Sequence, residues 1–311
     1  MSVIYKKVAL IGLGLIASSM GHAMKRAGVA GCVIGYAKTK ETRDMAMKLG
    51  FVDKVAGSAA EAVDQADLVV ICVPVGVMGA VAQEIGPKLK AGATVSDVGS
   101  VKQAVIDAIA PHLSKDVHFV PAHPLAGTEH SGPASGFADL FKNRWCIMTP
   151  PRGADKDAVA DLRKFWESFG ANVEEMTPDH HDLVLAVTSH APHLIAYTMV
   201  GVADDLSRVT DKEVVDFSAA GFRDFTRIAA SDPTMWRDVF LNNKEATLEI
   251  LGRFTEELFD LQRAIRRGDG QQLHDYFTRT RAIRRGIIDA GQDTDAGNFG
   301  RGDGRDGGDK A

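Results

Sequence analysis

The stretch "VALIGLGLIASS" (residues 8–19) decides the fold. A short apolar run leads directly into the pattern Gly12-x-Gly14-x-x-Ala17, and the residues that follow have helical character. Glycines at these places permit a tight turn and let the main chain approach a pyrophosphate, which the helix N-terminus then binds. Such a loop is a weak signal by itself, but its strand–loop–helix context predicts a dinucleotide site. Its predicted contacts are Gly12, Gly14, Leu15, Ile16 and Ala17.

Strand-like and helix-like segments alternate through the first half of the chain. Apolar, β-branched runs occur at 8–14, 32–37, 68–74, 93–99, 117–122 and 144–150, and amphipathic stretches at 18–28, 41–50 and 101–113 lie between some of them. Continuously apolar strands are buried on both faces, which is typical of a parallel sheet covered by helices. The sequence therefore predicts an α/β fold, with an N-terminal Rossmann-type doubly wound parallel sheet over residues 1–174.

Helical periodicity replaces this alternation in the second half. Long helical patterns occur at 182–206 and 242–268, and no convincing strand pattern lies between about 180 and 290. One apolar stripe in the second pattern consists of Leu248, Leu251, Phe254, Leu258 and Leu261. We expect an all-helical substrate and dimerisation domain at 175–290, and favour a homodimer over a monomeric core. The Gly- and Asp-rich segment 291–311 is predicted to be a disordered tail.

Composition limits the classes of protein that need to be considered. The chain has 311 residues, 45% of them hydrophobic, and a net charge of -5. Arg-rich segments at 263–270 and 279–286 are interpreted as solvated helix faces rather than a nucleic-acid site. The three cysteines are far apart, which favours a reducing compartment. The apolar run 68–82 is too short to span a membrane, and the N-terminus has no signal-peptide pattern. We expect a soluble, cytoplasmic protein without nucleic-acid or membrane partners.

The end of the second predicted strand lacks the acid expected of an NAD site. In "GYAKTKET" (35–42), Ala37 stands where Asp or Glu would bind the adenine ribose, and Lys38 and Thr39 follow. A 2′-phosphate is not repelled there, and nearby cations and a hydroxyl can bind it. We therefore expect use of NADP or NAD, with a slight preference for NADP. The alternative is a solvated turn in an enzyme that binds NAD through other contacts.

A histidine follows another predicted strand in "VPAHPLAGTEHSGP" (120–133). His123 lies at the carboxyl end of that strand, the edge at which doubly wound sheets bind ligands.

Five motifs in order resemble the prephenate/arogenate (cyclohexadienyl) dehydrogenase family. They are "GLGLIASS" (12–19), "SDVGSVK" (96–102), "PAHPLAGTEHSG" (121–132), "SHAPH" (189–193) and "GFRDFTRIAASDPTMWRD" (221–238), and the resemblance runs from about residue 5 to residue 288. It implies an NAD(P)-dependent oxidoreductase of tyrosine biosynthesis that oxidatively decarboxylates prephenate, arogenate or both. Loss of CO2 then makes the ring aromatic.

The resemblance also implies residue roles. His123 is the base of the hydride step, and Ser100 orients it and touches substrate and nicotinamide; Ser100 also suits a helix N-cap. Arg227 holds the ring carboxylate through a planar guanidinium, with Arg223 as the neighbouring candidate. The other expected substrate contacts are Thr128, Glu129, His190, His193, Asp224 and Trp236. Val73, Pro74 and Ser100 complete the expected cofactor site with the glycine loop, Lys38 and Thr39.

Three alternatives accompany this interpretation. A metal site at His180, His181, His190 and His193 is not expected, because Pro192 interrupts the HxxH pair and no further ligand completes a tetrahedral spacing. A 3-hydroxyacid dehydrogenase would use a lysine in the helical domain, and no lysine there lies in such a motif. A non-catalytic NAD(P)-binding sensor would not need His123, Ser100 and Arg227 together.

Overall fold

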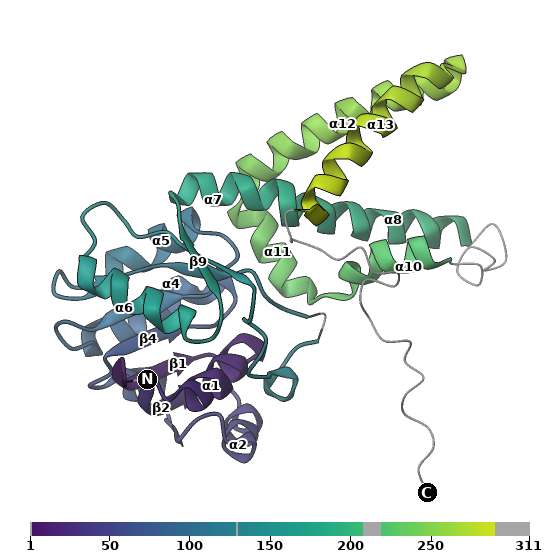
Figure 1. Cartoon of the computed structure of the whole chain (residues 1–311). Coiled ribbons are helices and arrows are strands. Elements are labelled where there is room, and N and C mark those ends of the chain that lie inside the picture. Colours follow the sequence, from purple (N-terminus) through teal and green to yellow (C-terminus); the bar gives the residue numbers. More distant parts are fainter. Residues whose placement is uncertain (1, 129, 208–218, 290–311) are drawn as a thin grey trace, which may run out of the picture. The chain divides into compact units, whose positions relative to one another are not determined.

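The computed structural model describes residues 2–128, 130–207 and 219–289 (Figure 1). The predicted disordered tail at 291–311 lies outside the described residues. The described residues up to Ile250 form one compact unit, and those from Leu251 onward form another.

A six-stranded parallel sheet forms the centre of the first unit, in the order β3-β2-β1-β4-β5-β6. Its strands are β1 Tyr5–Ile11, β2 Ala30–Tyr36, β3 Lys54–Val55, β4 Leu68–Ile71, β5 Thr94–Asp97 and β6 His118–Phe119. The chain order reverses between β1 and β4, and this switch point is where open parallel sheets bind ligands. The expected doubly wound Rossmann-type sheet is confirmed.

Alternate residues of the central strands enter two separate cores. Val8 and Leu10 of β1 pack in one core with residues of α1 and α6, whereas Ala9 and Ile11 pack in the other with residues of α3, α4 and α5. The helices around the sheet are α1 Leu15–Ala27, α2 Lys40–Leu49, α3 Ala59–Val63, α4 Met78–Ile85, α5 Gln103–Ile109 and α6 Lys156–Glu167. Burial on both faces explains why the strands have continuously apolar sequences.

A second, three-stranded sheet was not predicted. It contains β7 Ala122–Pro124, β8 Trp145–Met148 and β9 Asn172–Glu175, with β7 antiparallel and β9 parallel to β8. The prediction of one strand at 117–122 is therefore wrong. Pro121, which has no N–H to continue a ladder, lies where the chain leaves the first sheet for the second. The second sheet holds His123 in β7, opposite Ile147 of β8.

All described elements after β9 are helical, in agreement with the predicted helical second half. They are α7 Pro178–Leu185, a π-helical turn Ala186–His190, α8 Ala191–Ser207, α10 Ala220–Thr226, α11 Pro233–Asn242, α12 Lys244–Arg267 and α13 Gly270–Asp289, besides a 3-10 turn at Arg227–Ala230. The π-helical turn lies just before Pro192, whose missing N–H disrupts the regular ladder.

One helical run, Pro178–Leu206, is long and apolar enough to cross a membrane by length and composition alone. The core helix of a soluble protein meets the same criterion, and this run carries buried His181, Asp182 and His190.

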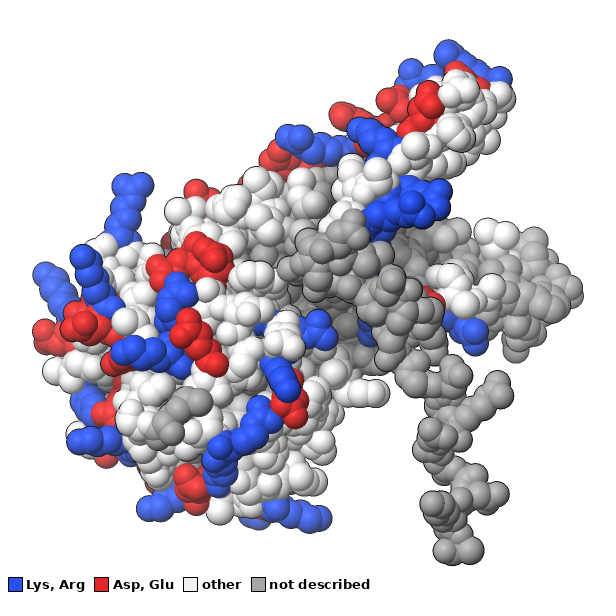
Figure 2. Space-filling model, in the orientation of Figure 1, with Lys and Arg blue, Asp and Glu red and all other residues white. Residues whose placement is uncertain are grey.

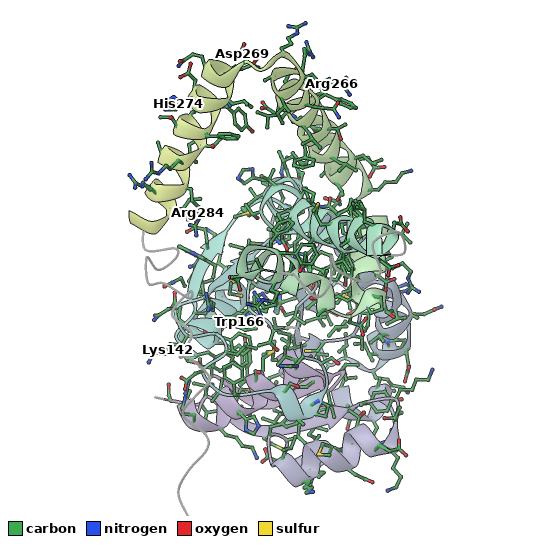
Figure 3. The ribbon with its side chains drawn as sticks, turned by 90° about the vertical axis from the view of Figure 1, so that its right-hand side faces the viewer. Lys142, Trp166, Arg266, Asp269, His274 and Arg284 are labelled. Carbon is green, nitrogen blue, oxygen red and sulfur yellow. The ribbon has the colours of Figure 1, made fainter. Side chains whose placement is uncertain are left out.

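The described residues of the second unit are the part of α12 from Leu251 onward and the whole of α13. A tight turn at Gly268 and Asp269 joins the two helices. Figure 3 shows Asp269 at the turn, between Arg266 at the end of α12 and His274 in α13. Large apolar side chains are exposed along α12 and α13, including Phe259 and Phe277. On the face shown in Figure 2, side chains of both charges are interspersed over the part of the first unit that contains the sheets.

Candidate active site

The glycine loop connects β1 to α1 at the switch point of the sheet. Gly12 has a φ of 96°, and a Cβ there would lie 2.7 Å from the Cys72 carbonyl oxygen and 2.9 Å from Val73 Cγ1. A side chain is therefore excluded at Gly12. Gly14 immediately precedes α1, and a Cβ there would meet nothing within 4 Å. The open space beside the N-terminus of α1 fits a dinucleotide pyrophosphate, and Pro74 follows Val73 at the end of β4.

The segment after β2 carries the residues expected at the adenine ribose. Arg43 Nη1 donates to the carbonyl oxygens of Ala37 at 2.5 Å and Lys38 at 3.2 Å. Thr39 caps α2, because its hydroxyl accepts a main-chain N–H at 3.3 Å. Lys40 forms a 2.6 Å ion pair with an aspartate one turn later. The segment thus brings together Lys38, Thr39 and Arg43, which could face a 2′-phosphate. Thr39 and Arg43 already form hydrogen bonds within the segment.

A buried ion pair shapes the turn after β5. Asp97 and Lys102 are both fully buried and paired, and Lys102 Nζ also donates to the Ala122 carbonyl oxygen at 2.8 Å. Asp97 Oδ2 accepts the Gly99 N–H at 2.7 Å. Burial lowers the pKa of Lys102, and the neighbouring Asp97 carboxylate opposes this effect. These contacts fix the turn that bears Ser100 against β7, the strand that bears His123.

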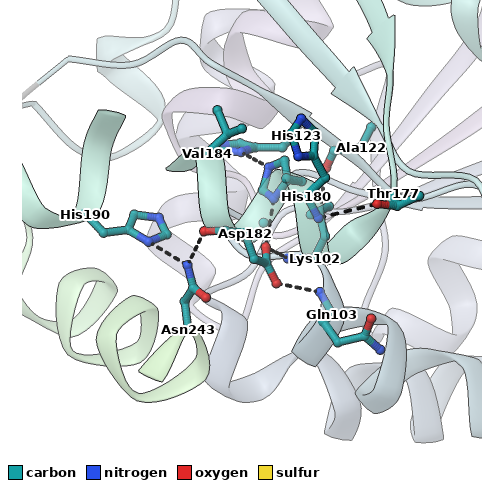
Figure 4. Close-up of polar contacts among 12 residues, drawn as sticks. Lys102, Gln103, Ala122, His123, Thr177, His180, Asp182, Val184, His190 and Asn243 are labelled. Atoms are coloured by element: carbon teal, nitrogen blue, oxygen red, sulfur yellow. Dashed lines mark hydrogen bonds and ion pairs between the residues drawn. The ribbon is translucent and has the colours of Figure 1, made fainter. Parts of the chain in front are cut away.

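His123 begins a row of three buried side chains, whose two ends, His123 and Asp182, are labelled in Figure 4. Its Nδ1 lies 2.8 Å from Nε2 of His181, and His181 Nδ1 lies 2.8 Å from Oδ1 of Asp182. Asp182 Oδ1 also accepts the Lys102 N–H at 2.7 Å, and Asp182 Oδ2 accepts the Gln103 N–H at 3.0 Å. Thus Asp182, just after the first turn of α7, joins this helix to the N-terminus of α5, which its carboxylate caps.

Local sequence explains why α7 presents these two side chains. Thr177 is the N-cap, with its hydroxyl accepting the His180 N–H at 3.4 Å, and Pro178 occupies the first helical position, where its missing N–H costs nothing. The side chains of consecutive helical residues diverge, so His180 is exposed while His181 is buried.

The suggestion that Ser100 caps the following helix is wrong. The helix α5 begins at Gln103, and Asp182, about 80 residues later in the chain, supplies the cap. No hydrogen bond joins Ser100 to His123 within the described part of the chain. The imidazole ring of His123 instead contacts His181. The orienting role of Ser100 stays a prediction. The His190 ring lies beside the Ser100 main chain, which places Ser100 at this site.

Two further histidines lie on the helical side of the site. Asn243 Nδ2 lies 3.0 Å from His190 Nδ1 and donates to the Asp182 carbonyl oxygen at 2.8 Å. His193 stacks on Trp236, with ring centroids 3.8 Å apart and an interplanar angle of 27°. The structure therefore brings these predicted substrate contacts together beside the His123 row.

Burial lowers the pKa values of the histidines of the site and so favours their neutral forms. It lowers the pKa of His123 well below its ordinary value, and the repulsion that His181, Lys102 and His190 exert when protonated acts in the same direction. Burial also lowers the pKa of His190 to about 4 and that of His181 below its ordinary value. A neutral His123 can accept a proton near pH 7, as a general base must.

The predicted residues around the substrate differ in their surroundings. Arg227 is half-buried, and its charge helps burial to lower the pKa of His193, so it lies close to that ring. Arg223 and Asp224 are exposed, which favours Arg227 over Arg223 as the carboxylate ligand. Thr128 is exposed and its hydroxyl accepts the His130 N–H at 3.2 Å, within its own loop. Glu129 lies outside the described residues.

Sequence reasoning missed His181, Asp182, Lys102 and Asn243 as parts of this site. His181 was considered only as a metal ligand, and within the described ranges no group of three or more His, Cys, Asp or Glu side chains is arranged to hold a metal. The signal that could have revealed His181 and Asp182 is their place shortly after the clear Thr-Pro start of a helix. Nothing in the sequence indicates that they contact residues 102, 103 and 123.

A doubly wound sheet, an open glycine turn at its switch point and a neutral buried histidine nearby define a nicotinamide-dinucleotide-dependent dehydrogenase. Family comparison specifies the class further. The nucleotide-binding domain of prephenate dehydrogenase matches residues 20–175, and the dimerization domain of prephenate dehydrogenase matches residues 177–279. The chain belongs to the prephenate dehydrogenase family, and it is an NAD(P)-dependent oxidoreductase.

Individual relatives agree with this assignment. The chain is 41% identical over 281 residues to a cyclohexadienyl dehydrogenase of Zymomonas mobilis, covering 90% of this chain and 96% of that protein. It is 34% identical to a prephenate dehydrogenase of Bacillus subtilis, over 90% and 76% of the two chains. The fold is also similar to that of Aquifex aeolicus prephenate dehydrogenase, which was solved with hydroxyphenyl propionate and NAD+. The TM-score is 0.85 at 34% identity, and the match covers 91% of this chain and 98% of that chain. Synechocystis arogenate dehydrogenase has a TM-score of 0.75 at 26% identity, and the match covers 90% of this chain and 99% of that chain.

The family predicted from the five motifs is confirmed. The two rival classes, a 3-hydroxyacid dehydrogenase and a non-catalytic sensor, are not favoured.

Proposed function

We propose that this enzyme oxidatively decarboxylates prephenate, arogenate or both, and so forms 4-hydroxyphenylpyruvate or tyrosine with CO2 and NAD(P)H. The observation that carries the proposal is the position and state of His123. It lies in β7 next to the Ser100 turn, is neutral because of its burial, and has one ring nitrogen fixed by His181. Such a histidine can take the proton of a hydroxyl on the substrate ring while hydride leaves the carbon that bears this hydroxyl.

The chain's own residues have three tasks in this reaction. His123 accepts the hydroxyl proton, and the developing carbonyl then draws the electrons of the C–CO2 bond into the ring, which becomes aromatic. Arg227 binds the ring carboxylate through a bidentate guanidinium, and Ser100 orients the hydroxyl end of the substrate. Bound NAD(P) supplies the hydride acceptor. The remaining substrate contacts in this proposal are Thr128, Glu129, His190, His193, Asp224 and Trp236.

We propose that NADP serves at least as well as NAD. Support comes from Ala37, which leaves the end of β2 without the usual carboxylate, and from the exposed Lys38 and Thr39 beside it. The pyrophosphate lies at Gly12, Gly14, Leu15, Ile16 and Ala17, and the nicotinamide side reaches Val73, Pro74 and Ser100.

The proposed assembly is a homodimer formed through the helical half, residues 175–290, while residues 1–174 bind the dinucleotide. Support comes from the match to a family dimerization domain and from exposed apolar side chains along α8 and α12, such as Val202, Leu248 and Leu258. A cytoplasmic location accords with this chemistry.

The test is an assay of nicotinamide reduction with prephenate and arogenate, each offered with NAD and with NADP. We expect turnover with at least one substrate, and NADP to give at least the kcat/KM of NAD. A His123→Ala variant is the control, since it should bind dinucleotide normally and lose turnover. If all four combinations are silent although the dinucleotide binds, the proposed reaction is incorrect.

A further inference from the structure

His181 lies between His123 and an anchored carboxylate, in a row of buried side chains. His123 is in β7 and His181 in α7, 58 residues later, and the His181 side chain is fully buried. Both contacts of the row, from His123 to His181 and from His181 to Asp182, measure 2.8 Å (Figure 4). At this spacing each contact requires one donor and one acceptor.

The Asp182 end of the row determines where the protons lie. Asp182 accepts two main-chain N–H groups, from Lys102 and Gln103, at the N-terminus of α5. Burial alone would raise the Asp182 pKa, but hydrogen bonds from His181 and from these two N–H groups lower it below its ordinary value. An ionised carboxylate can only accept hydrogen bonds. The proton in the second contact must therefore belong to Nδ1 of His181.

The donor and acceptor assignment then continues to His123. Neutral His181 with its proton on Nδ1 has only a lone pair on Nε2, so Nδ1 of His123 must donate to it. A neutral His123 with its proton on Nδ1 keeps the lone pair on Nε2. That nitrogen has no hydrogen-bond partner among the described residues, so it is the ring atom available to a substrate.

We propose that His181 is a positioning residue which, held by Asp182, fixes the Nδ1–H tautomer of His123 and leaves Nε2 as the proton acceptor. In the reaction proposed above, on which this role rests, the substrate O–H bond breaks and an N–H bond forms at Nε2. The resulting imidazolium of His123 is stabilised through His181 by the Asp182 carboxylate. This arrangement follows the logic of a base oriented by a third group.

The first experiment needs no substrate. In uniformly ¹⁵N-histidine-labelled enzyme, the ring nitrogens of each histidine report which of them carries the proton. We expect neutral His123 and neutral His181 both to be protonated on Nδ1, with assignments from the His123→Ala and His181→Gln variants. A proton on Nε2 of neutral His123 would overturn the proposal.

The second experiment separates positioning from packing by comparing two variants. His181→Leu fills the space but offers no acceptor, whereas His181→Gln can present an amide oxygen near the place of Nε2. We expect His181→Leu to lower kcat by about 100-fold, with His123 shifted toward the Nε2–H tautomer. His181→Gln should retain kcat within about tenfold of wild type, and both variants should keep KM within about threefold.

The matched control is His180→Gln, which changes the adjacent exposed histidine of the same helical turn and should leave all parameters unchanged. Equal kcat losses in His181→Leu and His181→Gln would show a packing role and contradict the proposal. If His181→Leu does not fold, the wild-type tautomer and the His181→Gln kinetics still decide. If the reaction itself were assigned wrongly, the assay would fail in wild type while the ¹⁵N result still tested the row.

Discussion

A single residue at the end of β2, Ala37, is expected to control the choice of dinucleotide. We predict that Ala37→Asp lowers kcat/KM for NADP by about tenfold relative to NAD, or about 1.4 kcal/mol, because a carboxylate repels the 2′-phosphate and binds the ribose hydroxyls. Steady-state kinetics with both dinucleotides measures this ratio. Ala91→Asp is the control, since it makes the same change at an exposed loop before β5. If Ala37→Asp leaves the ratio of kcat/KM for NADP to that for NAD unchanged, the adenine ribose does not bind at residue 37.

At the scale of elements, the turn between β1 and α1 separates a structural glycine from a ligand-facing one. We predict that Gly12→Ala destabilises the protein by about 2–3 kcal/mol, because its φ is 96° and its Cβ would meet the Cys72 carbonyl oxygen. Gly14→Ala should fold with nearly wild-type stability and bind NAD(P) about tenfold more weakly, because its Cβ would enter the space beside the N-terminus of α1. Thermal denaturation and dinucleotide titration distinguish the two, and similar behaviour of both variants would contradict the division.

At the scale of the whole molecule, the apolar stripe of α12 carries the proposed association. We predict that the double variant Phe254→Glu/Leu258→Glu sediments near the chain mass of 33.3 kDa, whereas wild type sediments near twice that mass. Both residues are exposed in the single chain, so charges there should not disturb its own core. Gln262→Glu adds negative charge at another exposed position of α12 and should remain dimeric. A double variant that stays dimeric would exclude this stripe as the interface.

The sequence allowed the Rossmann-type sheet, the helical second half and the family to be predicted, because continuous apolar strands and the glycine turn are local signals. The strand β9 was missed because only Val173 among its four residues is even half-buried, which leaves no apolar run to detect. The end of a predicted strand drew attention to His123, and the family resemblance to His193, but the partner of His123 depends on a contact across 58 residues. That contact, like the capping of α5 by Asp182, is a property of tertiary packing that neither spacing nor propensity encodes.

The hydrogen bonds from the N-terminus of α5 to Asp182 also connect the two family domains of the chain. The carboxylate comes from a segment that the family assigns to dimerization, and the amide groups come from the nucleotide-binding segment. The proposed base His123 lies on one side of this contact, and His181, its proposed positioning residue, lies on the other. If these roles hold, cofactor binding and substrate chemistry are not two independent modules: exchanging either half among relatives would replace either the base or the two residues that position it.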